Sequence, residues 1–117
     1  MKFTVQRDHL ENELQFLQGI AEKKKTIPIL SNVLIAAAGE SLSLVATDLE
    51  VSLSTACPAK VSEPGGITVS SKKLFEVVRS LPEGEIDMSS ERGEWLEVRA
   101  GDSSFRLVAL PVPAFPA

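Results

Sequence analysis

Residues 39–48 (GESLSLVATD) and residues 93–102 (GEWLEVRAGD) decide how this chain folds, because the second stretch repeats the first fifty-four positions later. Both keep a Gly-Glu pair, apolar residues at the same alternate positions, an alanine and a closing aspartate. Alternation between turn residues is typical of a strand with one buried face. Each stretch is therefore predicted to be a turn, a strand and a second turn.

The surroundings of the two stretches repeat as well. Upstream, a short strand pattern at residues 3–5 and again at residues 67–69 is followed by leucine and valine residues at helical spacing. Downstream, the apolar residues of segment 51–53 correspond to those of segment 105–107. Repeated units of this length can share one core.

The two copies are predicted to form one domain. The repeating units are residues 1–60 and 66–111, and the Pro-Gly-Gly between them is too short for a flexible domain linker. A chain of 117 residues with 44% hydrophobic residues can bury a real core. The expected fold is α+β, with two pseudo-symmetric β-α-β-β-β units and two helices packed against antiparallel sheets.

The local patterns predict the bounds of the elements. The first helix is expected to begin at Arg7 or Asp8 and to end at Gly19, and the second to be capped by Ser70 or Ser71. Strands are expected at residues 2–6, 33–38, 41–47 and 50–57, from residue 67, and at residues 85–90, 94–100 and 103–110.

Charge is distributed unevenly along the chain. The net charge of −4 argues against a protein that coats nucleic acid by bulk attraction. Acids gather between Glu83 and Asp102, whereas the bases gather in two other places. These bases are Lys23, Lys24 and Lys25, which lie in an insertion that the second copy lacks, and Lys72, Lys73 and Arg79 on the second helix. The sequence thus predicts one basic and one acidic face.

The composition limits the class of protein. No apolar run approaches the length that spans a membrane, and the amino terminus has no signal-peptide pattern, so a cytoplasmic location is expected. The single cysteine, Cys57, permits no internal disulfide and no cysteine cage for a metal, and it is interpreted as a packing residue at a strand end. No cofactor or metal is expected.

The sequence offers little for catalysis. His9 is the only histidine, and its neighbour Asp8 points to another side of the helix, so a surface histidine is favoured over a general base. Asp48, Glu50 and Asp102 lie in predicted turns, where aspartate commonly bonds to its own backbone. A turn-forming role is favoured over an acid-base pair or a metal site, and no enzyme activity is expected.

The basic face of the helices has two possible interpretations. Lys72, Glu76 and Arg79 share one stripe of the second helix, with Lys73 beside it, and Arg7 lies on the corresponding stripe of the first. A solvated helix face and a surface that contacts phosphate fit this pattern equally well.

Several motifs in register resemble one known family. They are residues 1–5 (MKFTV), 26–34 (TIPILSNVL), 46–50 (ATDLE), 72–75 (KKLF) with 81–84 (LPEG), and the prolines of residues 110–116. Together they resemble the amino-terminal domain of the bacterial DNA polymerase III β subunit, the sliding clamp, over essentially the whole chain. The resemblance implies the DNA clamp fold, with helices lining a central hole and strands forming the outer wall.

The resemblance also implies sites. Lys24 and Lys72 match basic residues that contact duplex phosphates, and the surrounding bases Lys23, Lys25, Arg7, Lys73 and Arg79 complete the expected DNA-binding set. Phe105 and Leu107, with Ser104 and Arg106, match the strand that pairs with the neighbouring subunit. One departure is that Asp102, Ser103 and Ser104 stand where similar clamps place bases, which weakens the case for an ionic interface.

The implied function is that of a processivity factor without catalysis. A homodimeric ring of such subunits would encircle double-stranded DNA and tether the polymerase, and polymerase and clamp loader would bind through the other two of three expected domains. The alternative is a stand-alone interaction module, without a DNA role, that binds partners through the edge strand 103–110.

Overall fold

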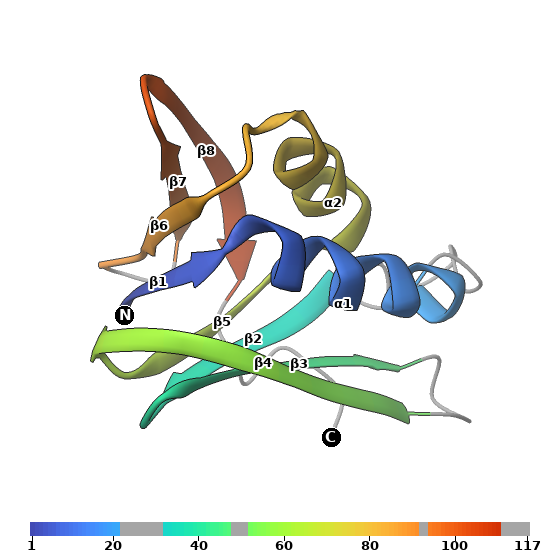
Figure 1. The fold of residues 1–117 in the computed structure, drawn as a ribbon. Helices are drawn as coiled ribbons and strands as arrows, with labels where there is room; N and C mark the ends of the chain where they lie inside the picture. The colour runs from blue at the N-terminus through green and yellow to red at the C-terminus, as the bar shows by residue number, and fades with distance from the viewer. Residues whose placement is uncertain (22–31, 48–51, 92–93, 111–117) are drawn as a thin grey trace.

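The computed structural model of this chain describes residues 1–21, 32–47, 52–91 and 94–110. The first half of the chain forms one β-α-β-β-β series and the second half forms another (Figure 1). The elements are β1 (Lys2–Gln6), α1 (Arg7–Ala21), β2 (Asn32–Ala38), β3 (Ser41–Thr47), β4 (Ser52–Glu63), β5 (Gly65–Ser70), α2 (Ser71–Ser80), β6 (Glu85–Ser89), β7 (Trp95–Ala100) and β8 (Ser103–Leu110).

The strands form one closed antiparallel arrangement in the order β1-β4-β3-β2-β5-β8-β7-β6. Moving four places along this order replaces each strand of the first unit by its counterpart in the second. The units join where β1 pairs with β6 and where β2 pairs with β5. The predicted α+β class with two pseudo-symmetric units is confirmed.

The two helices lie side by side and antiparallel. The Arg7 side chain at the start of α1 donates to the carbonyls of Val78 and Arg79 at the end of α2. At the opposite ends, the Ser71 hydroxyl donates to Gln18 Oε1 at 3.1 Å. In Figure 1, α1 runs across the layer formed by β2, β3 and β4, and α2 lies beside β8.

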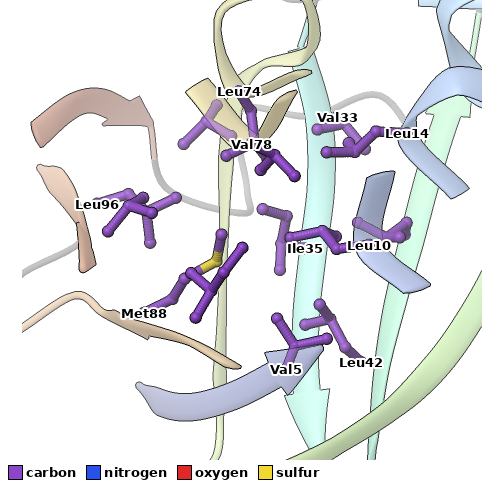
Figure 2. Packing of buried hydrophobic residues seen from close by; sticks show 14 of the residues in the cluster. Val5, Leu10, Leu14, Val33, Ile35, Leu42, Leu74, Val78, Met88 and Leu96 are labelled. Carbon is purple, nitrogen blue, oxygen red and sulfur yellow. The ribbon is translucent and has the colours of Figure 1, made fainter. Parts of the chain in front are cut away.

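One hydrophobic core serves both units. The helices contribute the leucines and valines predicted from their spacing, including the fully buried Leu10, Leu14, Leu74 and Val78. Figure 2 shows these side chains converging with strand residues of both halves. They meet Val5, Val33, Ile35 and Leu42 of the first unit and Met88 and Leu96 of the second.

Strand β4 is longer than the sequence predicted. Instead of ending at Cys57, it continues through Pro58 to Glu63. Residues 52–58 pair with β3, and residues 59–63 pair with β1. Proline lacks an N–H, so it is tolerated where a strand changes partner and no donor is needed. The predicted end of the strand at Cys57 was therefore wrong by six residues, and Cys57 lies within the strand.

The joint between the halves is also tighter than expected. Strand β5 begins at Gly65, so Pro64 alone separates it from β4. A Cβ atom at Gly65 would lie 3.1 Å from Met1 Cβ, which explains why glycine fits this position. Helix α1 extends past Gly19 to Ala21, and β2 buries Val33, Ile35 and Ala37 while its other face is half-buried.

Candidate nucleic-acid and strand-pairing surfaces

Helix α2 carries three of the described residues of the predicted basic face. The Ser70 hydroxyl caps it by accepting from the Lys73 N–H at 3.2 Å, as predicted for one of the two serines. Its buried stripe is Ser71, Leu74 and Val78. This stripe leaves three basic residues exposed on the rest of the helix, namely Lys72, Lys73 and Arg79.

The described lysines and arginines divide into two groups. The first group has carboxylate partners: Lys2 with Glu63, Arg7 with Asp8 and Glu11, Lys60 with Glu85, and Arg99 with Glu97. In the second group, no described carboxylate lies within 4.0 Å of the charge. Its members are Lys72, Lys73, Arg79 and Arg106, all on α2 or on the neighbouring β8.

Arg7 differs from the other predicted DNA-binding residues. Its guanidinium lies 2.9 Å from Asp8 and 3.3 Å from Glu11, and it donates to two carbonyls at the end of α2. Its side chain is only 17% exposed. Cations near a helix carboxyl terminus stabilise the unpaired carbonyls there. The arrangement therefore gives Arg7 a structural function, since it ties the start of α1 to the end of α2.

The last part of α1 lies near the amino end of α2. Gln18, in the last part of α1, hydrogen-bonds with Ser71 in both directions. In the sequence, Lys23 follows the end of α1 by two positions. Lys23, Lys24 and Lys25 themselves lie outside the described residues, as do Asp48 and Glu50.

Strand β8 has a partly free side. It pairs along its length with β7, from Ser103 opposite Ala100 to Val108 opposite Trp95. On its other side it pairs with β5 at Ala109 and Leu110. Within the described chain, residues 103–108 therefore have a side without a strand partner. The prediction of an edge over residues 103–110 was too long by two residues, because the sheet closes at the end of β8.

A groove of about 670 Å³ runs between this free side and α2. Its apolar part includes Phe105 and Val108, which are 37% and 64% exposed, together with Leu107 and Val77. Lys73 also lines the groove, whereas Lys72 and Arg79 are not among its lining residues. The exposed charges of α2 thus divide, with Lys73 facing β8.

Sequence reasoning missed Trp95. Its side chain is 42% exposed and lines the same groove. The Arg106 guanidinium lies 4.5 Å from its ring centroid. The two residues are diagonal neighbours on one sheet face, because Trp95 pairs with Val108. The signal was available, since Trp95 stands at an outward position of the repeated strand, where the first copy has Ser41.

The residues considered as catalytic candidates do not form a site in the described chain. His9 is exposed and lines a 590 Å³ pocket with Glu40, Lys60 and Glu85, of which Lys60 and Glu85 form an ion pair. Asp102 is exposed in the turn after Gly101, whose φ of 58° favours glycine. Among the described residues, no group of three or more histidine, cysteine, aspartate or glutamate side chains is placed to hold a metal.

Two further findings concern Cys57 and the helices. Cys57 is buried, and burial, together with the nearby Glu13 carboxylate, raises the pKa of its thiol to about 11. Neither described helix is long and apolar enough to cross a membrane.

Comparison with known proteins assigns this chain to a family. Residues 1–117 match the family described as DNA polymerase III beta subunit, N-terminal domain. The chain is 44% identical to the beta sliding clamps of Pseudomonas aeruginosa and Escherichia coli K12, and 38% identical to that of Chlamydia pneumoniae. These matches cover 99% of this chain and 32% of each relative, so the chain spans about a third of their length.

Solved structures agree with this assignment. The fold matches the DNA polymerase III subunit beta of Pseudomonas aeruginosa with a TM-score of 0.92 and 44% identity. It matches the DNA polymerase sliding clamp of Caulobacter crescentus with a TM-score of 0.93 and 40% identity. Each match covers 100% of this chain and 32% of the solved one. The chain belongs to the DNA polymerase III beta subunit family, whose N-terminal domain it matches from its first residue to its last.

Proposed function

We propose that this chain is the amino-terminal domain of a replicative sliding clamp, a ring that encircles duplex DNA and tethers the polymerase. The observation that carries the proposal is the group of unpaired cations on α2. Lys72 and Arg79 are exposed and have no described carboxylate within 4.0 Å. Cations that the protein leaves unpaired are available to phosphates.

The chemistry of this surface suits sliding better than sequence reading. Phosphate contacts position a protein on DNA without reading bases, and strong base contacts would hold a ring in one place. Lys72 and Arg79 are charges on one short helix, and Arg79 stacks on Phe75 with 5.3 Å from its guanidinium to the ring centroid. We infer that this domain touches DNA weakly and that ring closure keeps the clamp on its template.

The rest of the clamp supplies what this domain lacks. The curated relatives are about three times as long as this chain, so two further domains of similar size fit in each. We infer that a homodimeric ring forms through β8, with Phe105, Leu107, Ser104 and Arg106 at the contact. Polymerase and clamp loader would bind the other domains, which leaves this domain without a catalytic role.

The experiment is a DNA-binding titration of the 117-residue chain. Weak binding to duplexes of unrelated sequence is expected, and the logarithm of the affinity should fall with the logarithm of salt concentration by about 0.9 per phosphate contact. Lys72→Glu and Lys24→Glu should weaken binding and leave the midpoint of thermal unfolding nearly unchanged. Lys60→Glu is the matched control, because Lys60 is already paired with Glu85 on another surface.

A second candidate function is favoured by the free side of β8. An interaction module without a DNA role would bind an extended segment there by strand addition. The same titration separates the two proposals. DNA binding that is absent at low salt, or that is tight, sequence-selective and resistant to salt, would contradict the clamp proposal.

A further inference from the structure

Helix α1 carries an exposed aromatic ring, Phe16. Its side chain is 62% exposed, although Leu14 and Leu17 beside it in the sequence are fully buried. Phe16 follows Asn12 by four positions and His9 by seven, so these three exposed side chains share one stripe of the helix. The stripe offers an aromatic ring, an amide and an imidazole to the solvent.

Phe16 lies at the same end of the helix pair as Lys72. Gln18 of α1 hydrogen-bonds with Ser71 of α2, and Phe16 and Lys72 each stand within two positions of these contacts. Helices in contact have axes about 8–10 Å apart. A nucleic-acid strand that crosses both helices at this end therefore meets a cation without a described carboxylate partner and an exposed aromatic ring within a few nucleotides.

The charges of the two helices allow a polyanion to approach this end. Each acid of α1 has a partner within the chain, because Arg7 holds Asp8 and Glu11, and Thr55 donates a hydrogen bond to Glu13. Such pairing weakens the repulsion between these carboxylates and a phosphate. Helix α2 has three basic residues against one glutamate, so it is net positive.

We propose that α1 and α2 together bind an unpaired nucleic-acid strand, with one base stacked on Phe16 and a phosphate held by Lys72. Proteins that bind single strands combine these two parts, a positively charged track for the backbone and aromatic rings on which bases stack. Every base has a stacking face, so this contact tolerates any sequence and is compatible with sliding. The inference rests on the proposed function, because replication supplies unpaired template strand beside the duplex.

The test uses the 117-residue chain and three fluorescein-labelled probes of about twelve nucleotides, a length within the usual site sizes of single-strand binding domains. The probes are oligothymidine, an abasic strand with the same phosphates and no bases, and a duplex. Fluorescence anisotropy at low salt measures the affinity for each probe. The abasic strand and the duplex show whether an effect requires an unpaired base.

The deciding variant is Phe16→Leu, which keeps an apolar side chain but removes the aromatic face. It should weaken oligothymidine binding about five- to tenfold and change binding of the other two probes less than about twofold. Phe16→Trp should restore tight binding of oligothymidine, because it supplies a larger stacking surface. Lys72→Glu should weaken binding of all three probes. Phe105→Leu is the matched control, since it removes an exposed ring from β8 and should change none of the affinities.

The possible failures are distinguishable. Unchanged oligothymidine binding in Phe16→Leu, or equal losses for all three probes, would overturn the inference. A loss confined to oligothymidine does not arise from unfolding, because the other two probes report on the same protein. If duplex binding requires Lys72 but Phe16→Leu has no effect, the proposed function stands without the stacking site. If oligothymidine binding requires Phe16 but the duplex is not bound, the stacking site is real and the clamp proposal fails.

Discussion

The two halves of this domain share one architecture but differ in how the charged side chains on their surfaces are paired. In the first half, Arg7 of α1 is bound by Asp8 and Glu11, and Glu13 of α1 accepts a hydrogen bond from Thr55 of β4 at 2.5 Å. In the second half, α2 and β8 leave their cations unpaired within the described chain. Phe105, Val108 and Leu110 of β8 are exposed, whereas the exposed large apolar side chain of the first half is Phe16 of α1. The repeat therefore fixes the core, whereas the pairing of the charged side chains outside the core differs between the halves.

The strand positions show the same contrast. Counting by the offset of the repeat, Ser52 and Ser54 of β4 correspond to Arg106 and Val108 of β8. Both strands have a stretch that pairs on one side only within the described chain, residues 52–58 in β4 and residues 103–108 in β8. Small hydroxyls stand on β4, whereas a cation and a 64% exposed valine stand on β8.

The largest expected effect tests whether the cores of the halves are equivalent. Leu10 and Leu74 occupy corresponding helix positions, and both are fully buried. Leu10→Ala and Leu74→Ala should each lower the free energy of unfolding by about 2–5 kcal/mol, because each removes buried methyl groups and leaves a cavity. Urea unfolding measures both, and losses that differ by more than about 2 kcal/mol would show that the two halves do not share the core equally.

The next effect concerns the arginines of the two helices. Arg7→Gln should lower the free energy of unfolding by about 1.5–3 kcal/mol, because it leaves the Val78 and Arg79 carbonyls without a charged donor. Arg79→Gln should change it by only about 0.5 kcal/mol, because it loses an exposed stacking contact. DNA affinity should change in the opposite order, with a larger loss for Arg79→Gln than for Arg7→Gln. Equal losses of stability would contradict the structural function assigned to Arg7.

The Arg7 prediction marks a limit of sequence reasoning. Helical spacing placed Arg7 on the stripe of α1 that corresponds to the basic face of α2, and Arg7 does begin α1. The antiparallel packing of the helices, which no local pattern contains, brings the end of α2 within reach of its guanidinium. Long-range contacts of this kind decide whether a charge is available to a ligand.

Other parts of the fold were predictable because their signals are local. Alternation gave the bounds of β3 and β8 correctly, and the serine cap gave the start of α2. The passage of β4 through Pro58 was not predictable, because it depends on a change of partner from β3 to β1. The Trp95–Arg106 contact likewise depends on the register of β7 against β8.

A third effect compares the two partly free strands. We expect the isolated chain to self-associate through β8, because an unpaired strand side with exposed apolar residues is a template for another strand. Val108→Lys should weaken this association about tenfold, the equivalent of losing about 1.4 kcal/mol of contact energy. Ser54→Lys, at the corresponding position of β4, is the matched control and should have little effect.

Sedimentation velocity over a range of concentrations measures this difference. Both variants add the same charge to a strand side, so net charge does not explain a different outcome. A protein that stays monomeric at every concentration would contradict the expected association. Equal weakening by the two substitutions would contradict the distinction between the strands.

The smallest effect is a pH dependence in the first half. Burial and the Glu13 carboxylate raise the pKa of the Cys57 thiol from 9.0 to about 11, so the folded state favours the neutral thiol. The resulting stabilisation is fully present below pH 9 and is lost as the pH rises toward 11, because the unfolded chain releases this proton first. At pH 10 the loss should be about 1 kcal/mol. Cys57→Ala removes the thiol and keeps every lysine, whose side chains also lose their protons in this pH range. The free energy of unfolding of this variant should therefore fall less steeply between pH 8 and pH 11 in urea titrations. Parallel curves for the two proteins would show that Glu13 and the surrounding core do not oppose ionisation of the thiol.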